Sequence, residues 1–124
     1  MQTFKKDERL CSRKVISELF EKGNSFNVFP IKTIWLKTSF ESPYPAKILI
    51  VVPKKNIKKA VDRNKIKRRI REIYRKNKES LYEYLKRTEK QYVFALIYLD
   101  KNIISFKELE EKIILTLQRL INKT

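Results

Sequence analysis

Histidine is absent from this 124-residue chain, and cysteine and glycine occur once each, as Cys11 and Gly23. Without histidine, the sequence can form no Cys/His zinc site, Ser-His-Asp triad or Cys-His catalytic pair. A lone cysteine forms no disulfide within the chain, and we expect Cys11 to be an incidental thiol, buried or half-buried. The carboxylates Asp7, Glu8 and Asp62 make no convincing cluster for metal catalysis, so the sequence predicts no metal site in the protein.

Long apolar runs are missing as well. No stretch of about 18 apolar residues occurs, so nothing is expected to span a membrane. Residues 1–10 lack the apolar core of a secretory signal, and a reducing cytoplasm is the expected compartment. Hydrophobic residues still make up 42% and aromatic residues 11% of the chain, which is too much for a disordered basic tail. We therefore predict one folded domain over residues 1–124.

Positive charge is abundant and is concentrated in one segment. The stretch "KKNIKKAVDRNKIKRRIREIYR", residues 54–75, contains eleven Lys or Arg and two acidic residues, so it carries +9 of the chain's net charge of +16. A compositional bias toward lysine, as in AT-rich genomes, does not explain five arginines between positions 63 and 75. A field this concentrated favours a polyanionic partner, with nucleic acid first and an anionic membrane surface second.

The first half of the chain predicts one helix followed by strands. Residues 12–23 predict a short helix, with Ser12 as its N-cap and Gly23 at its C-terminal end. Residues 26–40 are rich in β-branched and aromatic side chains. They predict a strand with Pro30 near its start or on an edge, or else two separate strands, "FNVF" and "TIWL". Residues 46–55 form a nearly continuous apolar run, typical of a strand buried on both faces.

The second half predicts three helices and one more buried strand. The basic segment predicts a helix over about residues 57–77, and residues 78–87 predict a shorter one. Residues 91–99 predict another fully apolar strand. A final amphipathic helix begins at the capping box made by Ser105 and Glu108. Its predicted core face consists of Leu109, Ile113, Leu117, Leu120 and Ile121. Buried strands on both sides of the basic helix favour a βαβ unit inside one small α/β sandwich.

The basic helix divides into three faces, since each residue turns it by about 100°. An apolar stripe that would anchor the helix in the core consists of Ile66, Ile70, Ile73 and Tyr74. The adjoining face gathers cations and one amide: Arg63, Asn64, Lys67, Arg68, Arg71 and Arg75. The remaining face carries Lys65, Arg69, Glu72 and Lys76.

The cationic face is suited to a nucleic acid backbone. Arginine pairs bidentately with phosphate oxygens and lysine supplies a point charge, so several on one face can span successive phosphates. Asn64 can add a hydrogen bond to a base edge or a 2′-hydroxyl. The alternative is a solvated helix face with i,i+4 ion pairs. Only Glu72, beside Arg68 and Lys76, is placed to neutralise these cations, which favours the nucleic acid.

Residues 54–75 also closely resemble the signature of the bacterial ribonuclease P protein component. That signature combines a Lys pair, a short spacer, Ala-Val-x-Arg-Asn, Lys-Arg-x-x-Arg-Glu and an aromatic-Arg ending. The matching residues are Lys54, Lys55, Ala60, Val61, Arg63, Asn64, Lys67, Arg68, Arg71, Glu72, Tyr74 and Arg75. Outside this segment the resemblance is looser. It includes the early Arg9-Leu10 pair, the Leu-Phe before Gly23, the late apolar strand and the last helix.

This resemblance implies a fold and a function. The fold would be a small α-β sandwich of the ribosomal protein S5 domain 2-like type. It has a mixed four-stranded sheet, about three helices and a left-handed βαβ crossover, against the usual handedness. The protein would be the non-catalytic subunit of a ribonucleoprotein endonuclease that removes the 5′ leader from precursor tRNA. The RNA subunit and its Mg²⁺ ions would perform the hydrolysis, and no organic cofactor is implied.

The resemblance also implies roles for single residues. Those expected to bind the RNA subunit are Lys54, Lys55, Arg63, Asn64, Lys67, Arg68, Arg71 and Arg75. The single-stranded leader would lie in a cleft between the first helix and the sheet, lined by Phe20 and Ile16. Periodicity alone would instead place Phe20 in the core. The family often has a second phenylalanine where this chain has Ile16, and an aliphatic side chain cannot stack on a base. Leu49 and Pro53 stand where the family commonly has glycine and a small residue.

Three other functions stay open at this point. A different small RNA-binding structural protein, such as a ribosomal protein, would share the basic helix but not the Arg63-Asn64 to Arg71-Glu72 pattern. A protein nuclease would need a histidine or a carboxylate cluster, and the sequence offers neither. A membrane-surface protein would need a broad exposed apolar face, whereas the stripe from Ile66 to Tyr74 is narrow and suits a core.

Overall fold

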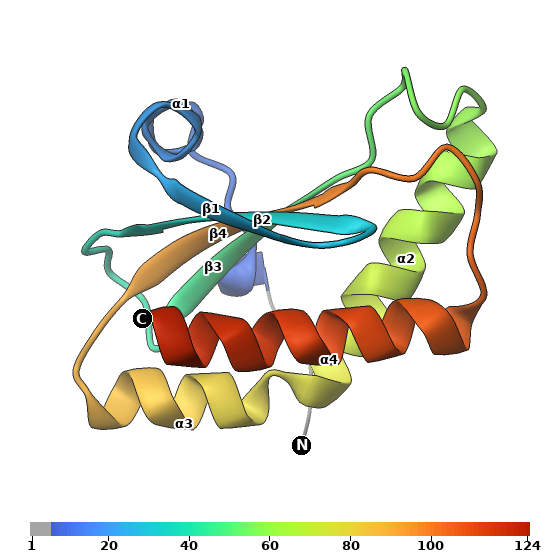
Figure 1. The fold of residues 1–124 in the computed structure, drawn as a ribbon. Coiled ribbons are helices and arrows are strands. Elements are labelled where there is room, and N and C mark those ends of the chain that lie inside the picture. Colours follow the sequence, from blue (N-terminus) through green and yellow to red (C-terminus); the bar gives the residue numbers. More distant parts are fainter. Residues whose placement is uncertain (1–5) are drawn as a thin grey trace.

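The fold, described for residues 6–124 of a computed structural model, is a layered arrangement of one sheet and helices (Figure 1). Its elements in chain order are a short 3₁₀ helix Lys6–Glu8, α1 Arg13–Lys22, β1 Asn24–Val28, β2 Ile31–Lys37, β3 Ala46–Val51, α2 Ala60–Asn77, α3 Glu79–Arg87, β4 Tyr92–Tyr98 and α4 Phe106–Lys123. The predicted short helix, the basic helix, the helix after it and the closing helix are all confirmed.

The sheet is mixed and has the strand order β1-β2-β4-β3. β1 and β2 are antiparallel, as are β2 and β4, whereas β3 and β4 are parallel. Helix α1 covers one face, and α2, α3 and α4 lie on the other (Figure 1). The expected α-β sandwich with a four-stranded mixed sheet is thus confirmed, with four α-helices in residues 6–124 rather than about three. The left-handed crossover between β3 and β4 stays a prediction.

The segment 26–40 is not one strand. It forms the hairpin of β1 and β2, whose register runs from Asn24 opposite Trp35 to Val28 opposite Ile31. The prediction of a single strand is therefore wrong, and the alternative of two strands is correct. Pro30 lies in the turn, where its missing N–H interrupts no ladder. Its carbonyl accepts a hydrogen bond from the backbone N–H of Leu99 at 2.7 Å.

The two parallel strands differ in how deeply they are buried. In β4 every residue except Ile97 is buried, as predicted. In β3 only Ala46 and Ile48 are buried, and the rest of the strand is half-buried. The prediction of burial on both faces is wrong for β3 because this strand forms an edge of the sheet. The exposed flank of β3 becomes part of the site described below.

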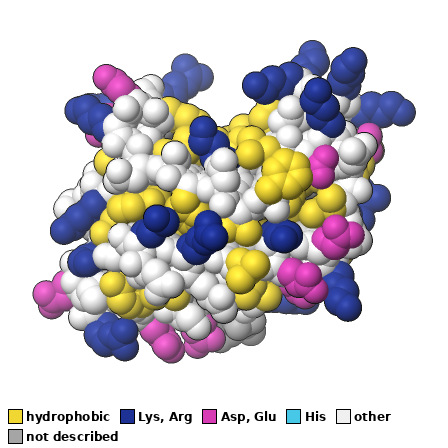
Figure 2. Space-filling view, in the orientation of Figure 1, with side chains coloured by type: hydrophobic (Ala, Val, Ile, Leu, Met, Phe, Trp, Pro, Cys, Tyr) yellow, Lys and Arg dark blue, Asp and Glu magenta, His cyan; other side chains and the backbone are white. Residues whose placement is uncertain are grey.

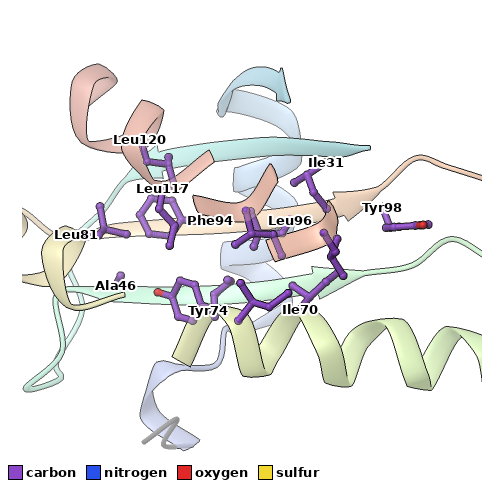
Figure 3. Packing of buried hydrophobic residues seen from close by; sticks show 14 of the residues in the cluster. Ile31, Ala46, Ile70, Tyr74, Leu81, Phe94, Leu96, Tyr98, Leu117 and Leu120 are labelled. Atoms are coloured by element: carbon purple, nitrogen blue, oxygen red, sulfur yellow. The ribbon is translucent and has the colours of Figure 1, made fainter. Parts of the chain in front are cut away.

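The main core lies between the sheet and the helices α2, α3 and α4. Figure 3 shows Phe94 and Leu96 of β4 between Leu117 of α4 and Ile70 of α2. All four residues of the predicted stripe on α2 are buried: Ile66, Ile70, Ile73 and Tyr74. The predicted core face of α4 is buried too, except that Ile121 is only half-buried. Each large apolar side chain buried here contributes about 1.5–3 kcal/mol, so the orientation of α2 is firmly set.

The basic helix starts later than predicted. It begins at Ala60, with Lys59 as its N-cap, and not near Ile57. Ile57 is buried in the loop before the helix, where its backbone N–H donates to Pro53 O at 3.1 Å. The predicted start is wrong because apolar spacing alone does not separate a buried loop residue from the first helical turn.

A second, smaller core lies between α1 and the opposite face of the sheet. It consists of Leu10, Leu19, Ile34, Val93 and Ala95. Ser12 caps α1 as predicted, since its hydroxyl accepts a hydrogen bond from the backbone N–H of Val15 at 3.3 Å. Ser105 caps α4 in the same way through the N–H of Glu108 at 3.2 Å.

Gly23 ends α1 as predicted and is needed for close packing. Its φ of −69° and ψ of 152° are open to any residue. A Cβ atom there, however, would collide with the carbonyl oxygen of Leu19 and lie 2.6 Å from Cγ2 of Ile34. The glycine thus allows the end of α1 to approach β2, which fixes the helix over this face of the sheet.

Candidate RNA interface

The outward face of α2 carries the predicted cations, whose side chains differ in how far they are exposed to solvent. Asn64 and Arg68 are exposed, and Lys67 and Arg71 are partly buried. Because the opposite stripe is locked in the core, these side chains are held on one side of the molecule. No acidic side chain among residues 6–124 is placed in an ion pair with Arg68. This face can therefore offer charge to an external anion.

Arg63 differs from the other predicted contacts. Its Nη1 donates to the carbonyl oxygens of Ile57 at 3.0 Å and Lys58 at 2.7 Å. The guanidinium thus binds the loop that precedes α2 to the first turn of the helix. Sequence reasoning assigned Arg63 to RNA alone and missed this internal role. With two of its five N–H donors directed inward, the rest of the fork stays available to a ligand.

The Lys pair lies on the loop that Arg63 braces. Lys54 and Lys55 are both exposed, in a hydrogen-bonded turn after β3. The next residue, Asn56, donates through Nδ2 to the carbonyl oxygen of Tyr98 at 3.1 Å. This bond fixes the turn against the end of β4, so the two ammonium groups project from a defined position next to the start of α2.

Arg75 is held by an acidic neighbour. Its guanidinium donates to both carboxylate oxygens of Glu72, at 2.7 and 3.1 Å, and Lys76 lies 3.8 Å from the same carboxylate. The hydrogen bonds from Arg75 lower the pKa of Glu72, and they raise the pKa of Arg75. The expectation that Glu72 pairs with Arg68 is wrong, since its partners are Arg75 and Lys76. Arg75 is thus the most neutralised of the predicted contacts.

A small pocket joins the N-terminal segment to the basic face. It has a volume of about 180 Å³ and is lined by Arg9, Leu10, Cys11, residues 48–50 of β3, Lys67 and Arg71. Partial burial, followed by the nearby charges of Arg9 and Arg68, lowers the pKa of Arg71. The only signal for Arg9 in the sequence was its place in the Arg-Leu pair, which sequence reasoning left without a role.

The N-terminal segment is anchored by a buried polar network. Glu8 is 0% exposed, and its Oε1 accepts hydrogen bonds from Nζ of the buried Lys78 and, at 2.7 Å, from the hydroxyl of Tyr82. The hydroxyl of Tyr74 donates in turn to that of Tyr82 at 3.1 Å. Burial, and then the neighbouring Tyr74, raises the pKa of Tyr82, so its hydroxyl stays protonated and can donate to Glu8. No sequence pattern signalled this contact across 70 positions.

The other candidate surface lies beside α1. Phe20 is 46% exposed while its neighbour Leu19 is fully buried, and Ile16 is half-buried against the small core. On the same face of the sheet, Ile97 is paired with Val51 on one side and Lys32 on the other, and all three are half-buried. Figure 2 shows a hollow between α1 and the start of α2, with hydrophobic side chains along it. Partial exposure contradicts a core position for Phe20.

Three other features bear on function. Cys11 is exposed, so the expectation of a buried or half-buried thiol is wrong. None of the helices between residues 6 and 124 is long and apolar enough to cross a membrane. Across the same residues, the structure brings together no group of three or more Cys, Asp or Glu side chains that could hold a metal ion.

Comparison with known proteins shows which family the chain belongs to. The sequence profile of the Ribonuclease P family matches residues 4–121. The chain belongs to this family. The "Ribonuclease P protein component" of Porphyromonas gingivalis is 31% identical over 105 residues, which cover 85% of this chain and 77% of that protein. The protein of the same name from Petrotoga mobilis is 40% identical over 77 residues, 62% of each chain.

Solved ribonuclease P proteins share the fold. The RNase P protein from Thermotoga maritima superposes with a TM-score of 0.70 at 28% identity, over 90% of this chain and 96% of that one. A mutant of the Staphylococcus aureus RNase P protein gives a TM-score of 0.72 at 20% identity, over 93% and 89% of the two chains. As a member of the ribonuclease P family, the chain is a protein component of that ribonucleoprotein, has its RNA as partner and acts in tRNA processing.

Proposed function

We propose that this protein binds the catalytic RNA subunit of ribonuclease P and the 5′ leader of precursor tRNA, and so assists removal of the leader. The observation that carries the proposal is the basic face of α2, which is fixed by the buried stripe opposite it. The helix backbone that carries the cations is fixed before binding, so only their side chains lose conformational freedom on binding phosphates. Each contact also releases counterions from the RNA. The RNA subunit would bind to Lys54, Lys55, Asn64, Lys67, Arg68 and Arg71, with smaller contributions from Arg63 and Arg75.

The protein is proposed to supply charge and position, with the chemistry left to the RNA. Hydrolysis would take place on the RNA subunit, which would hold the Mg²⁺ ions. Fixed positive charge near the RNA would lower the Mg²⁺ concentration that folding and cleavage require. The protein is expected to act in the cytoplasm.

The leader is proposed to lie in the hollow beside α1. Its bases would contact Phe20 and Ile16 on one side and the half-buried row of Lys32, Ile97 and Val51 on the other. An exposed aromatic ring offers a base a stacking surface whatever its sequence. Phe20 would supply most of this contact because Ile16 has no ring and is turned toward the small core.

Cleavage of a precursor tRNA at low Mg²⁺ tests the proposed function. The reaction is run with the catalytic RNA alone, the protein alone and both together. Cleavage that needs both components is the expected result, and it would assign the chemistry to the RNA. Cleavage by the protein alone would mean that an active site in the protein was missed. Tight RNA binding without stimulation would reduce the protein to an RNA-binding module.

Replacement of Phe20 by alanine should weaken binding of leader-bearing precursor to the holoenzyme by roughly 5- to 150-fold, because base stacking on an aromatic ring is worth about 1–3 kcal/mol. Binding of mature tRNA, which has no leader, should be unchanged. Affinities of both RNAs are measured with the same holoenzyme, and Phe20→Tyr should retain most of the wild-type value.

A matched control for this substitution is Phe106→Ala. Phe106 is also partly exposed, but it begins α4 on the opposite side of the sheet from α1 (Figure 1). The Phe106→Ala substitution should leave the preference of the holoenzyme for precursor over mature tRNA unaltered. Equal losses for precursor and mature tRNA with Phe20→Ala would remove Phe20 from the leader contact.

A further inference from the structure

We propose that Arg9, Lys67 and Arg71 jointly bind one phosphate group of an RNA strand, in the pocket where the N-terminal segment crosses the edge of β3 beside α2. The inference rests on the proposed function and deepens it. It adds a residue outside the basic helix to the RNA interface, and it assigns two residues of that helix to a shared phosphate.

The pocket suits a phosphate in size and lining. Its volume of about 180 Å³ is several times the roughly 30 Å³ that one water molecule occupies in the liquid, so a phosphate and its bound waters fit. Within the described chain, none of the residues that line it is acidic. Three cations from two separate parts of the chain therefore line one hollow, which favours an anion as its occupant.

Arg9 is held in place by its backbone and by both neighbours. It forms a parallel bridge with Ile48 of β3, and the N–H of Leu10 donates to Ile48 O at 2.9 Å. Glu8 before it and Leu10 after it are buried, while Arg9 itself is exposed. Of these three consecutive residues, only Arg9 therefore has its side chain on the surface, at the edge of the pocket. Because the backbone at Arg9 is fixed before binding, only the side chain loses conformational freedom when it binds a phosphate.

Lys67 and Arg71 are placed by the core stripe of α2. They are four residues apart and so lie one helical turn above each other on the same face. Both are partly buried, and burial together with Arg9 and Arg68 lowers the pKa of Arg71. Arg9 thus lies close enough to Arg71 for its positive charge to lower the pKa of Arg71. Two guanidinium forks and one ammonium would converge on the same phosphate oxygens.

Replacement of Arg9 by alanine tests the proposal. Loss of one phosphate contact should lower the affinity for RNA roughly three- to tenfold and reduce the slope of log affinity against log salt by about one. The probes are the catalytic RNA subunit, and leader-bearing precursor and mature tRNA offered to the holoenzyme. Arg9→Lys should restore part of the loss, because it keeps the charge without the fork. Arg87→Ala removes an equal charge from the end of α3, outside the pocket, and should change neither quantity.

A double-mutant cycle tests whether the phosphate is shared. If Arg9 and Arg71 bind one phosphate, the double variant Arg9→Ala/Arg71→Ala should lose less affinity than the product of the two single losses. For the control double variant Arg87→Ala/Arg71→Ala, the loss of affinity should equal the product of the two single losses. Fully multiplicative losses for Arg9 and Arg71 would overturn the shared phosphate.

Binding to the RNA subunit alone, and the preference of the holoenzyme for precursor over mature tRNA, together identify which RNA supplies the phosphate. Weaker binding of Arg9→Ala to the RNA subunit alone would place it in that subunit. Unchanged binding there, with a reduced preference of the holoenzyme for precursor over mature tRNA, would place it in the leader. No change with either probe would overturn the proposal even if the wild-type protein stimulates cleavage. Failure of the wild-type protein to stimulate cleavage would instead overturn the proposed function.

Discussion

Arg68→Ala combined with Arg71→Ala is expected to weaken binding to the catalytic RNA subunit by roughly 30-fold at low salt, as two charge-assisted contacts of about 1 kcal/mol each would do. The slope of log affinity against log salt should fall by about two, one for each lost phosphate contact. Arg68 is exposed and Arg71 partly buried on the outward face of α2. Titration of labelled RNA subunit at several salt concentrations measures both quantities.

The fold should survive this double substitution. Neither side chain belongs to the buried stripe of α2, and the two arginines repel each other across one helical turn. The melting temperature should therefore stay the same or rise slightly. Lys86→Ala with Arg87→Ala, which removes the same charge from the exposed end of α3, serves as the control and should leave RNA binding unaltered. Wild-type affinity and salt slope in the α2 variant would show that this face does not bind phosphate.

Elements and core were predictable from the sequence where one periodicity dominated. The stripe from Ile66 to Tyr74 and the apolar run of β4 each fix an orientation by themselves, and both were correctly predicted. Errors occurred where a second segment decided the outcome. β3 is half-exposed because it forms an edge of the sheet, and the helix start near Ile57 was wrong because that residue is buried by the loop packing.

The site shows the same division. Helical geometry placed Lys67, Arg68 and Arg71 on one outward face without any knowledge of the fold. The inward hydrogen bonds of Arg63 depend on how the loop before α2 turns back, and helical spacing carries no information about that loop. The meeting of Arg9 with Arg71 depends on the parallel bridge to β3, which joins segments far apart in the sequence.

Glu8 illustrates most clearly what local patterns miss. In the sequence it is one of several charged residues before the first helix. In the fold it is fully buried and bonded to Lys78 and Tyr82, at the junction of α2 and α3. Burial of a carboxylate is unfavourable unless a cation and hydrogen bonds compensate it. The network therefore ties the position of the N-terminal segment to the correct packing of the helices beneath the sheet.

Glu8→Ala is accordingly expected to lower the free energy of unfolding by about 3–5 kcal/mol, the usual cost of removing one partner of a buried ion pair. That loss is a large part of the roughly 5–15 kcal/mol that stabilises a domain, and it corresponds to a fall in melting temperature of roughly 10–20 °C. The cause is the buried Lys78 ammonium, which would no longer face a carboxylate. Thermal and denaturant unfolding followed by circular dichroism measure the effect.

Two further variants separate the buried charge from a general effect of the N-terminal segment. Asp7→Ala changes the exposed neighbour and should alter the melting temperature little, since surface substitutions usually cost less than 0.5 kcal/mol. Glu8→Ala/Lys78→Met removes both charges and should recover much of the stability, because an apolar side chain tolerates this environment better than an ammonium facing no carboxylate. A Glu8→Ala protein as stable as Asp7→Ala would show that the network does not hold the segment. The position of Arg9 would then have to come from the bridge to β3 alone.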